Sequence, residues 1–182
     1  YKNSMNKVEI NKIEGIKIYD IPFFSDERGM FFESFRKNNY NKNFKQDSIS
    51  FSKKNVLRGL HYQKKNTQAH LVTIIKGCIF DVTVDLRRSS KTFGKFASVE
   101  MSHDGIRQIF LPCGCAHGFQ VTSQEAIIHY KLTDYYSKAY EGGIRWNDPH
   151  LDIDWPNKKP IISFKDKNLK FFNDIENKET LF

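Results

Sequence analysis

The sequence predicts an all-β fold, either a barrel or a jelly roll, built of many short strands. Apolar and polar residues alternate with the period of a strand in many short runs, and turns containing Gly, Pro, Ser or Asp separate these runs. The chain also contains 16 Phe and 8 Tyr, which suits broad sheets that face one another. A helical pattern is expected only from Lys165 onward.

The first third of the chain contains two strand candidates joined by irregular segments. Gly15–Asp20 alternates apolar and polar residues, which is typical of a strand. Asp26–Gly29 has the composition of a turn, and Met30–Phe35 has that of a second strand, in which Glu33 needs a partner or solvent. Lys37–Lys45 has no clear period and is expected to form no more than one or two helical turns.

The middle of the chain predicts a β-hairpin. Its arms are Leu71–Ile75 and Cys78–Leu86, and its turn is Lys76–Gly77. In the second arm the apolar residues fall on one face and the polar residues Asp81, Thr83 and Asp85 on the other. We therefore expect this strand to line a wet space.

The remaining strand candidates follow at similar spacing and complete the all-β pattern. They are Phe93–Met101, Arg107–Leu111, His117–Thr122 and Ala126–Tyr136. Trp146–Pro149 and Asp154–Pro156 are expected to be ordered loops that cross one end of the barrel.

The length and the cysteine pattern bound the class of protein. A chain of 182 residues fits one domain, 1–182. Tyr1–Ser4, ahead of the first methionine, are consistent with a cloning remnant and carry no weight. Cys78, Cys113 and Cys115 form no disulfide framework and no signal segment leads the chain, so we expect a cytoplasmic protein. No apolar run approaches the roughly 20 residues that span a bilayer, so no membrane partner is expected.

The positive charge points to a small anionic substrate better than to nucleic acid. The net charge is +8 and the isoelectric point is near 9.3. Of the 29 basic residues, 22 are lysines, scattered singly or in pairs, and no nucleic-acid-binding motif accompanies them. The few arginines are more informative, because a guanidinium fork binds diphosphate well. Arg28 and Arg58 are the two that lie in motifs.

Four motifs could carry chemistry. Val56–Gln63 places an arginine, a glycine and a histidine inside an apolar, strand-like run, which by itself is compatible with purely structural roles. Three further motifs accompany it in the chain. They are Phe24–Gly29 with Phe32–Ser34, Pro112–Phe119, and Tyr130–Tyr136.

Together, in this order and at these intervals, the motifs resemble those of the dTDP-4-dehydrorhamnose 3,5-epimerase family, the RmlC-like cupins. The resemblance runs from about Ile16 to Asp166 and includes Val84–Arg87 and Trp146–Asp148. It implies a cupin-type double-stranded β-helix with short peripheral helices. It also implies inversion of C3 and C5 in a nucleotide-linked 4-keto-6-deoxy sugar, a step in deoxysugar and cell-surface polysaccharide biosynthesis. No cofactor is expected, because the ketone itself is the electron sink.

The resemblance implies a role for three side chains in the reaction. His61 matches the base, and a histidine titrates in the range that proton abstraction near neutrality requires. Tyr130 matches the acid on the opposite face of the sugar, although a packed tyrosine with a satisfied hydroxyl is the competing interpretation. Asp166 matches the carboxylate that orients the base.

A second set of residues matches positions that hold the nucleotide and its diphosphate. These residues are Arg28, Glu33, Gln46, Arg58, Glu141 and Lys165. Tyr136, or Tyr135 beside it, is expected to stack on the base, and His117 matches a pocket residue but is equally compatible with a structural role. In the family the segment that carries Arg28 reaches into a neighbouring subunit, so a homodimer is implied.

Two positions depart from the family pattern. His70 stands where a lysine that is thought to stabilise the enolate oxygen is usual. A neutral histidine donates one hydrogen bond and carries full charge only below its pKa, so this stabilisation is expected to be weaker. Ser48 stands where an asparagine is usual, which affects a contact with the sugar or the nucleotide.

Other functions remain open at this stage. A C3-only epimerase, or an epimerase of another 4-keto sugar nucleotide such as a GDP-heptose, fits the same motifs. A metal-dependent cupin would be expected to contain a His-x-His pair, which is absent from the sequence, so no metal is expected. A ketoisomerase or a non-catalytic binding module would not be expected to contain both His61 and Tyr130.

Overall fold

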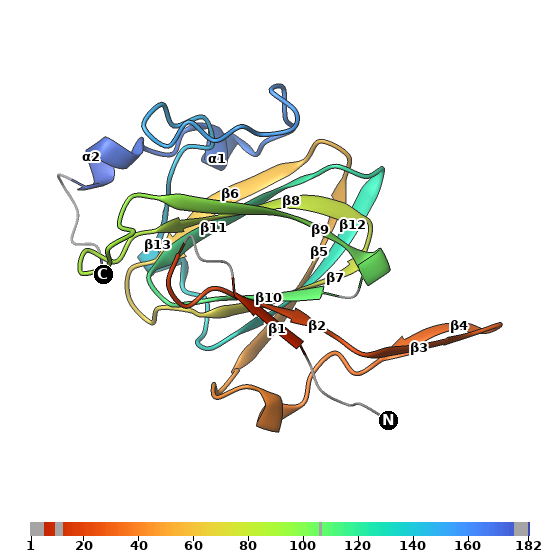
Figure 1. Ribbon diagram of the computed structural model, residues 1–182. Coiled ribbons are helices and arrows are strands. Elements are labelled where there is room, and N and C mark those ends of the chain that lie inside the picture. The colour runs from red at the N-terminus through yellow and green to blue at the C-terminus, as the bar shows by residue number, and fades with distance from the viewer. Residues whose placement is uncertain (1–5, 10–12, 106, 177–181) are drawn as a thin grey trace.

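The computed structural model describes residues 6–9, 13–105, 107–176 and 182, which form two antiparallel sheets that face each other (Figure 1). Within these residues, the six-stranded sheet has the spatial order β1 (Asn6–Glu9), β2 (Lys17–Asp20), β10 (Arg107–Leu111), β7 (His70–Lys76), β12 (Glu125–Leu132) and β5 (Gln46–Lys53). The five-stranded sheet has the order β13 (Glu141–Gly143), β6 (Leu57–Gln63), β11 (Cys115–Val121), β8 (Cys78–Asp85) and β9 (Phe96–Ser102). The predicted all-β class is confirmed.

The space between the sheets changes from apolar to polar along the strands. On β7 the inward-facing Ile74 and Val72 are fully buried in the main core, and the next inward residue is His70. On β11 the buried Phe119 belongs to the same core, and the next inward residue is His117. Because the period of a strand is two, this order places the polar side chains of both sheets at the same end of the sandwich. That end holds the site described below.

The C-terminal part of the chain covers the outer face of the five-stranded sheet (Figure 1). Val82 and Val84 of β8 and Leu60 of β6 are buried there beneath Trp155 and Phe172. This segment contains α1 (Phe164–Lys167) and α2 (Phe172–Glu176), which agree with the helical pattern expected after Lys165. The prediction that the two tryptophan loops cross an end of the barrel is wrong, because the sheet offers them an apolar outer face to cover.

The predicted hairpin between β7 and β8 is also wrong. The two strands have the expected positions, but β7 pairs with β10 and β12, whereas β8 pairs with β11 and β9 in the other sheet. Gly77 makes the crossing with φ of +81°, and a Cβ atom there would lie 2.0 Å from the carbonyl oxygen of Glu125. Only glycine fits this position.

The polar face of β8 is buried and serves two purposes. Asp81 and Thr83 face the interior, as the alternation predicts, and both are 1% exposed. Asp85 is fully buried and accepts hydrogen bonds from Arg87, Ser90 and Thr92 in the following turn. Burial alone would raise the pKa of Asp85, but these bonds lower it to about 2. Asp85 therefore stabilises the turn as a carboxylate.

In the described part of the chain, the outer face of the six-stranded sheet is covered at one side only. Residues 35–44, with the 3₁₀ turn η1 (Lys37–Asn39), pack Tyr40 against Leu71. Beyond this cover, Ile49 and Phe51 of β5 and Ile75 of β7 are 58%, 70% and 41% exposed. An exposed apolar strip therefore lies on this face, with two residues on the edge strand β5 and one on β7.

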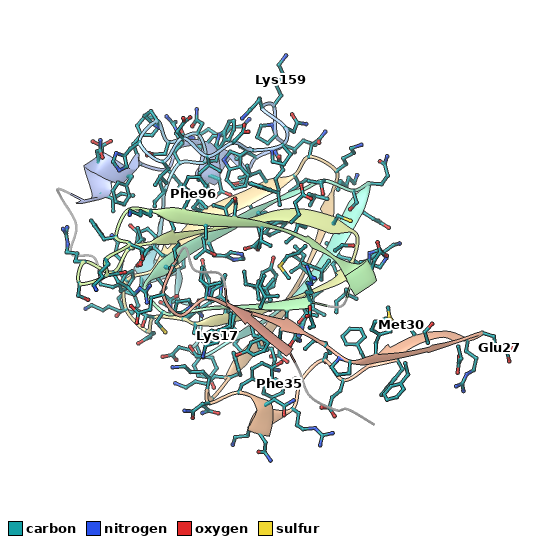
Figure 2. The ribbon with its side chains drawn as sticks, in the orientation of Figure 1. Lys17, Glu27, Met30, Phe35, Phe96 and Lys159 are labelled. Atoms are coloured by element: carbon teal, nitrogen blue, oxygen red, sulfur yellow. The ribbon has the colours of Figure 1, made fainter. Side chains whose placement is uncertain are left out.

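A two-stranded hairpin projects from the sandwich (Figure 1). It consists of β3 (Phe23–Asp26) and β4 (Gly29–Phe32), and Figure 2 shows Glu27 at its far tip and Met30 along its length. Phe24 and Phe31 pair across the two strands and are 53% and 71% exposed. The hairpin therefore exposes apolar side chains on both of its strands.

The described residues contain no helix that is long and apolar enough to cross a membrane.

Candidate active site

A cavity of about 740 Å³ opens between the sheets at their polar end. β6 and β11 form one wall, β5, β7 and β12 form the other, and the segment before α1 forms the rim. The residues predicted to act on the substrate that line it are His61, Tyr130, Asp166, His70, Arg58, His117 and Lys165. The cavity therefore brings together residues that are up to about a hundred positions apart in the chain.

His61 and Asp166 form a hydrogen-bonded pair at this cavity. His61 Nε2 lies 2.8 Å from Asp166 Oδ1, and the Asp166 side chain is 5% exposed against 32% for His61. The contact through Nε2 leaves Nδ1 as the ring nitrogen that can accept a proton from a ligand. The pair has the arrangement of a general base held by a carboxylate.

A glycine allows His61 to lie where it does. Gly59 has φ of +119°, and a Cβ atom there would lie 2.5 Å from the Gly118 Cα on β11. The register between β6 and β11 shifts at this point, between the pairs formed by His117 and Phe119. This irregularity lets both Arg58 and His61 line the cavity.

The start of α1 fixes Asp166. The Ser163 hydroxyl accepts a hydrogen bond from the Asp166 backbone N–H at 3.0 Å, which caps the helix. Burial alone would raise the pKa of Asp166, but the bond to His61 and the His61 charge lower it below its usual value. Asp166 is therefore a carboxylate at neutral pH and favours the tautomer that donates from His61 Nε2.

Tyr130 enters the same cavity from the opposite sheet. It lies on β12, and its hydroxyl is 3.2 Å from the Ser50 hydroxyl on β5. Burial raises the pKa of the phenol strongly and the charge of Asp81 adds to this, whereas the bond to Ser50 and the charge of Arg58 act the other way. The phenol is thus protonated and can act as a donor.

His117 and Asp81 form a second histidine–carboxylate pair on the five-stranded sheet. His117 Nε2 lies 2.7 Å from Asp81 Oδ2, and the side chains are 8% and 1% exposed. The His117 ring makes edge contacts with His70 at 5.6 Å and with Tyr130 at 6.4 Å between ring centroids. His117 therefore belongs both to the cavity wall and to a buried hydrogen bond, which agrees with each of its two predicted roles.

His70 is neutral. Burial and the neighbouring His117 lower its pKa to about 3. Among the residues that the structure describes, its Nδ1 atom finds no hydrogen-bond partner, and neither do Asp81 Oδ1 and Thr83 Oγ1 on the facing sheet. Buried polar atoms without partners mark places where a ligand can supply them.

Arg58 lines the cavity near the edge strand. Its Nε donates to the Ser52 hydroxyl at 3.0 Å, and its Nη2 donates to the Phe51 carbonyl at 3.4 Å. Lys165 lies on the rim and donates to Glu141 at 2.8 Å. These two cations can hold an anionic group at the mouth.

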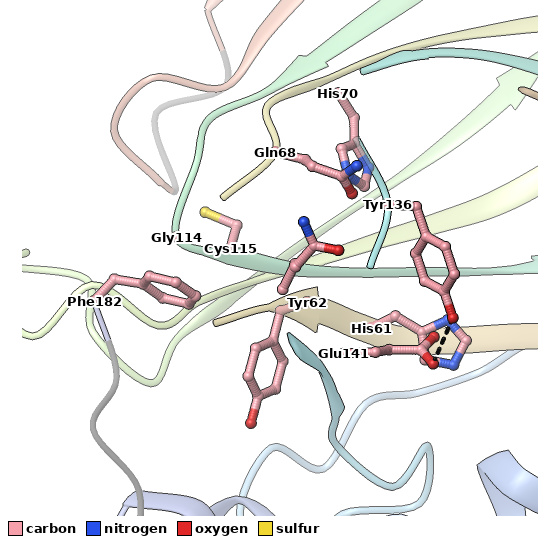
Figure 3. Close-up of a pocket in the computed structure, with 10 residues that line it drawn as sticks. His61, Tyr62, Gln68, His70, Gly114, Cys115, Tyr136, Glu141 and Phe182 are labelled. Carbon is pink, nitrogen blue, oxygen red and sulfur yellow. Dashed lines mark hydrogen bonds between the residues drawn. The ribbon is translucent and has the colours of Figure 1, made fainter. Parts of the chain in front are cut away.

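A smaller pocket of about 60 Å³ adjoins His61 and His70 (Figure 3). Tyr136 and Glu141 line it, and the Tyr136 hydroxyl donates to Glu141 at 3.1 Å beside the His61 ring. Gln46 accepts a hydrogen bond from the Tyr136 backbone N–H at 2.8 Å. The structure therefore brings together four predicted nucleotide-binding residues at the mouth of the site: Gln46, Tyr136, Glu141 and Lys165.

Three predicted ligand contacts lie elsewhere in this chain. Arg28 is at the turn of the projecting hairpin, where its side chain is 85% exposed and bonds to Asp26. Glu33 pairs with Arg36 near the base of the same hairpin. Ser48 lies on the inward face of β5 and accepts a hydrogen bond from Gln46 at 3.2 Å, but it does not line the main cavity.

Sequence reasoning missed three side chains of the site. Asp81 was expected only to face a wet space, and Ser50 and Ser52 were not singled out. Serines stand at alternate positions 48, 50 and 52 of this strand, between Ile49 and Phe51. Alternation alone would place the apolar side chains inward, so the local pattern gave no signal for a polar inner face.

A metal ion needs several ligand side chains grouped around one point. Among the residues that the structure describes, no group of three or more His, Cys, Asp or Glu side chains is arranged to hold a metal ion. The two histidine–carboxylate pairs are thus separate hydrogen-bonded dyads.

The fold and the comparisons define an all-β, cupin-like enzyme of the isomerase class. The family model described as dTDP-4-dehydrorhamnose 3,5-epimerase matches residues 11–174. The chain belongs to the dTDP-4-dehydrorhamnose 3,5-epimerase family.

Individual relatives cover almost the whole chain. A dTDP-4-dehydrorhamnose 3,5-epimerase of Shigella flexneri is 43% identical over 179 residues, which are 94% of this chain and 98% of the relative. The Legionella pneumophila dTDP-6-deoxy-D-glucose-3,5-epimerase, solved with dTDP-4-keto-L-rhamnose, is 42% identical with a TM-score of 0.89 and covers 93% of this chain and 94% of its own. A 3'-monoepimerase of Streptomyces bikiniensis, solved as a double mutant with dTDP, is 27% identical with a TM-score of 0.87 and covers 93% and 89%.

Proposed function

We propose that this protein inverts C3 and C5 of dTDP-4-dehydro-6-deoxyglucose, giving dTDP-4-dehydrorhamnose, by proton abstraction and reprotonation through an enolate. One observation carries the proposal: the carboxylate-paired His61 and the phenol of Tyr130 stand on different sheets and line one cavity. A base and an acid on opposite walls can act on opposite faces of one sugar ring, which inversion requires.

The reaction uses the two side chains in sequence. His61 Nδ1 takes the proton next to the ketone, and Asp166 stabilises the imidazolium that results. The electron pair moves into an enolate, whose oxygen is stabilised by donors in the cavity wall. Tyr130 then delivers a proton to the opposite face of the carbon, and the ketone re-forms. The neutral His70 is a donor to the enolate oxygen, in place of a fixed cation.

The diphosphate is held at the mouth of the cavity. Arg58 and Lys165 supply positive charge there, and Tyr136 is 51% exposed and thus available to stack on the nucleotide base. Gln46 and Glu141 fix this rim by bonding Tyr136. The net charge of +8 favours the approach of such a substrate.

Deuterium incorporation tests the proposal. The protein is incubated with dTDP-4-dehydro-6-deoxyglucose in deuterated water, and the sugar is analysed by NMR. We expect deuterium at both C3 and C5 with inversion at both. The absence of exchange at either carbon contradicts the proposed function, and the same assay with a GDP-linked 4-keto sugar tests the choice of nucleotide.

A C3-only epimerase is the second candidate, because the Streptomyces bikiniensis 3'-monoepimerase shares this fold. Deuterium and inversion at C3 alone identify this activity.

We further propose that the active form is a cytoplasmic homodimer of one-domain subunits, in which the hairpin of one subunit brings Arg28 to the site of the other. The exposed apolar strip of Ile49, Phe51 and Ile75 and the apolar arm support a second copy as the covering partner. Light scattering is expected to give twice the chain mass, and Phe51→Glu is expected to give the monomer. A wild-type monomer at micromolar concentration would contradict the dimer.

A further inference from the structure

The inner face of the edge strand β5 presents a row of serines to the cavity side of the sheet. Ser48 accepts a hydrogen bond from Gln46 at 3.2 Å, Ser50 bonds the Tyr130 hydroxyl at 3.2 Å, and Arg58 donates to Ser52 at 3.0 Å. Each serine thus holds a different side chain of the proposed machinery. One strand positions a rim residue, the acid and a diphosphate-binding cation.

Ser50 has a contact that strand geometry alone does not dictate. Tyr130 lies directly opposite Ser48 in the register of β12 and β5, yet its hydroxyl reaches the next serine of the row. Ser50 is the serine whose hydroxyl bonds the phenol, whereas Ser48 accepts a hydrogen bond from Gln46. Ser50 is partly exposed and lines the main cavity, which gives it access both to the phenol and to water.

A buried tyrosine that acts as an acid needs a neighbouring group that stabilises its phenolate. When Tyr130 gives up its proton, a phenolate remains on a largely buried side chain, where charge is costly. A hydroxyl that donates to this oxygen stabilises it, since hydrogen bonds to charged groups are stronger than those between neutral groups. The Ser50 and Tyr130 hydroxyl oxygens are 3.2 Å apart, and either can be the donor. When Tyr130 becomes a phenolate, the Ser50 hydroxyl can rotate so that it donates to the phenolate oxygen.

We propose that Ser50 is the positioning residue of Tyr130 and the route by which the phenolate recovers its proton; this inference rests on the proposed function. As the new C–H bond forms, the Tyr130 O–H bond breaks and a phenolate remains. Ser50 then gives its proton to the phenolate oxygen while it takes one from cavity water. The proton that His61 removed from the sugar returns to solvent and neutralises the hydroxide, so the cycle balances.

The test separates proton abstraction from proton delivery. In deuterated water, abstraction by His61 followed by return to the same face leaves deuterium in unepimerised substrate, whereas delivery by Tyr130 gives deuterium in the epimer. For Ser50→Ala we expect the ratio of epimer formation to substrate exchange to fall about tenfold, the effect of one lost hydrogen bond of about 1.4 kcal/mol. Ser50→Thr keeps a hydroxyl in a strand and is expected to restore the ratio.

Two further variants give the inference its controls. Ser52→Ala removes the contact of Arg58, so it is expected to raise KM with little change in the ratio. Ser98→Ala on β9, which does not line the cavity, is expected to match the wild type in both. Thermal melting checks that each variant is folded, and Ser50→Cys replaces Ser50→Ala if the latter does not fold.

The outcomes are distinct for the two proposals. Wild-type protein without exchange at C3 or C5 refutes the proposed function. If the wild type is active, two results for folded Ser50→Ala overturn the role of Ser50 and leave the proposed function intact. One is an unchanged ratio of epimer formation to substrate exchange, and the other is an equal loss of exchange and inversion.

Discussion

Replacing Asp166 by asparagine is the most direct test of the histidine–carboxylate pair. The substitution keeps the size of a side chain that is 5% exposed and removes its charge. An asparagine amide that donates to His61 Nε2 forces the proton onto Nδ1, so the ring can no longer accept one from the sugar. General base catalysis is worth about 10²- to 10⁴-fold, and we expect kcat to fall by that factor, about 3 to 5 kcal/mol.

Exchange of the substrate α-protons into deuterated water measures the effect, because this exchange requires abstraction but no inversion. Asp174→Asn, in the exposed part of α2, is the matched control and is expected to behave as wild type. A folded Asp166→Asn protein that exchanges the α-protons at the wild-type rate would refute the role of the pair. A loss confined to inversion would instead place the defect at the acid.

Three other changes have defined outcomes. Tyr130→Phe is expected to lower epimer formation by about 10²-fold or more while α-proton exchange continues; equal loss of both, measured in the same assay, would contradict its role as the acid. His70→Lys is expected to preserve or raise turnover, and abolished turnover in a folded variant would rule out His70 as the enolate donor. Asp85→Asn is expected to remove stability that depends on pH, because the pKa of Asp85 is lowered from 3.8 to about 2 in the folded protein. Such a carboxylate stabilises the fold above its unfolded pKa and loses this contribution, about 2 kcal/mol, as pH falls through the folded value. Urea unfolding at pH 7 and pH 2 should show wild type and variant converging at the lower pH, and a constant difference would contradict the assignment.

The strands and much of the site could be predicted from the sequence because their signals are local. Alternation identified β8 and β11, and the motifs pointed to His61 and Tyr130, which do line one cavity. The assignment of β7 and β8 to a hairpin failed because the tight turn at Gly77 is compatible with two arrangements. The two strands can pair with each other, or the chain can cross at Gly77 from one sheet to the other. The choice depends on strands later in the chain, because β12 pairs with β7 and β9 pairs with β8.

The contacts within the site could not be predicted in the same way. A serine in an edge strand, such as Ser50, is equally compatible with a solvated surface until the opposite sheet is placed. The pairing of His117 with Asp81 needs two strands whose register no local pattern specifies. The sequence left the charge of His70 open, because that charge depends on burial; burial and the neighbouring His117 lower its pKa to about 3 and keep the ring neutral.

The proposed base and acid are divided between the two layers of the sandwich, with His61 on β6 and Tyr130 on β12. The gap between them is therefore set by the thickness of the apolar filling, to which Ile74 and Phe119 contribute from opposite walls. Facing sheets lie roughly 10 Å apart, and their side chains decide that spacing. Core packing away from the substrate thus sets the distance between His61 and Tyr130. A methylene group added to or removed from this core changes that distance without any contact with the sugar.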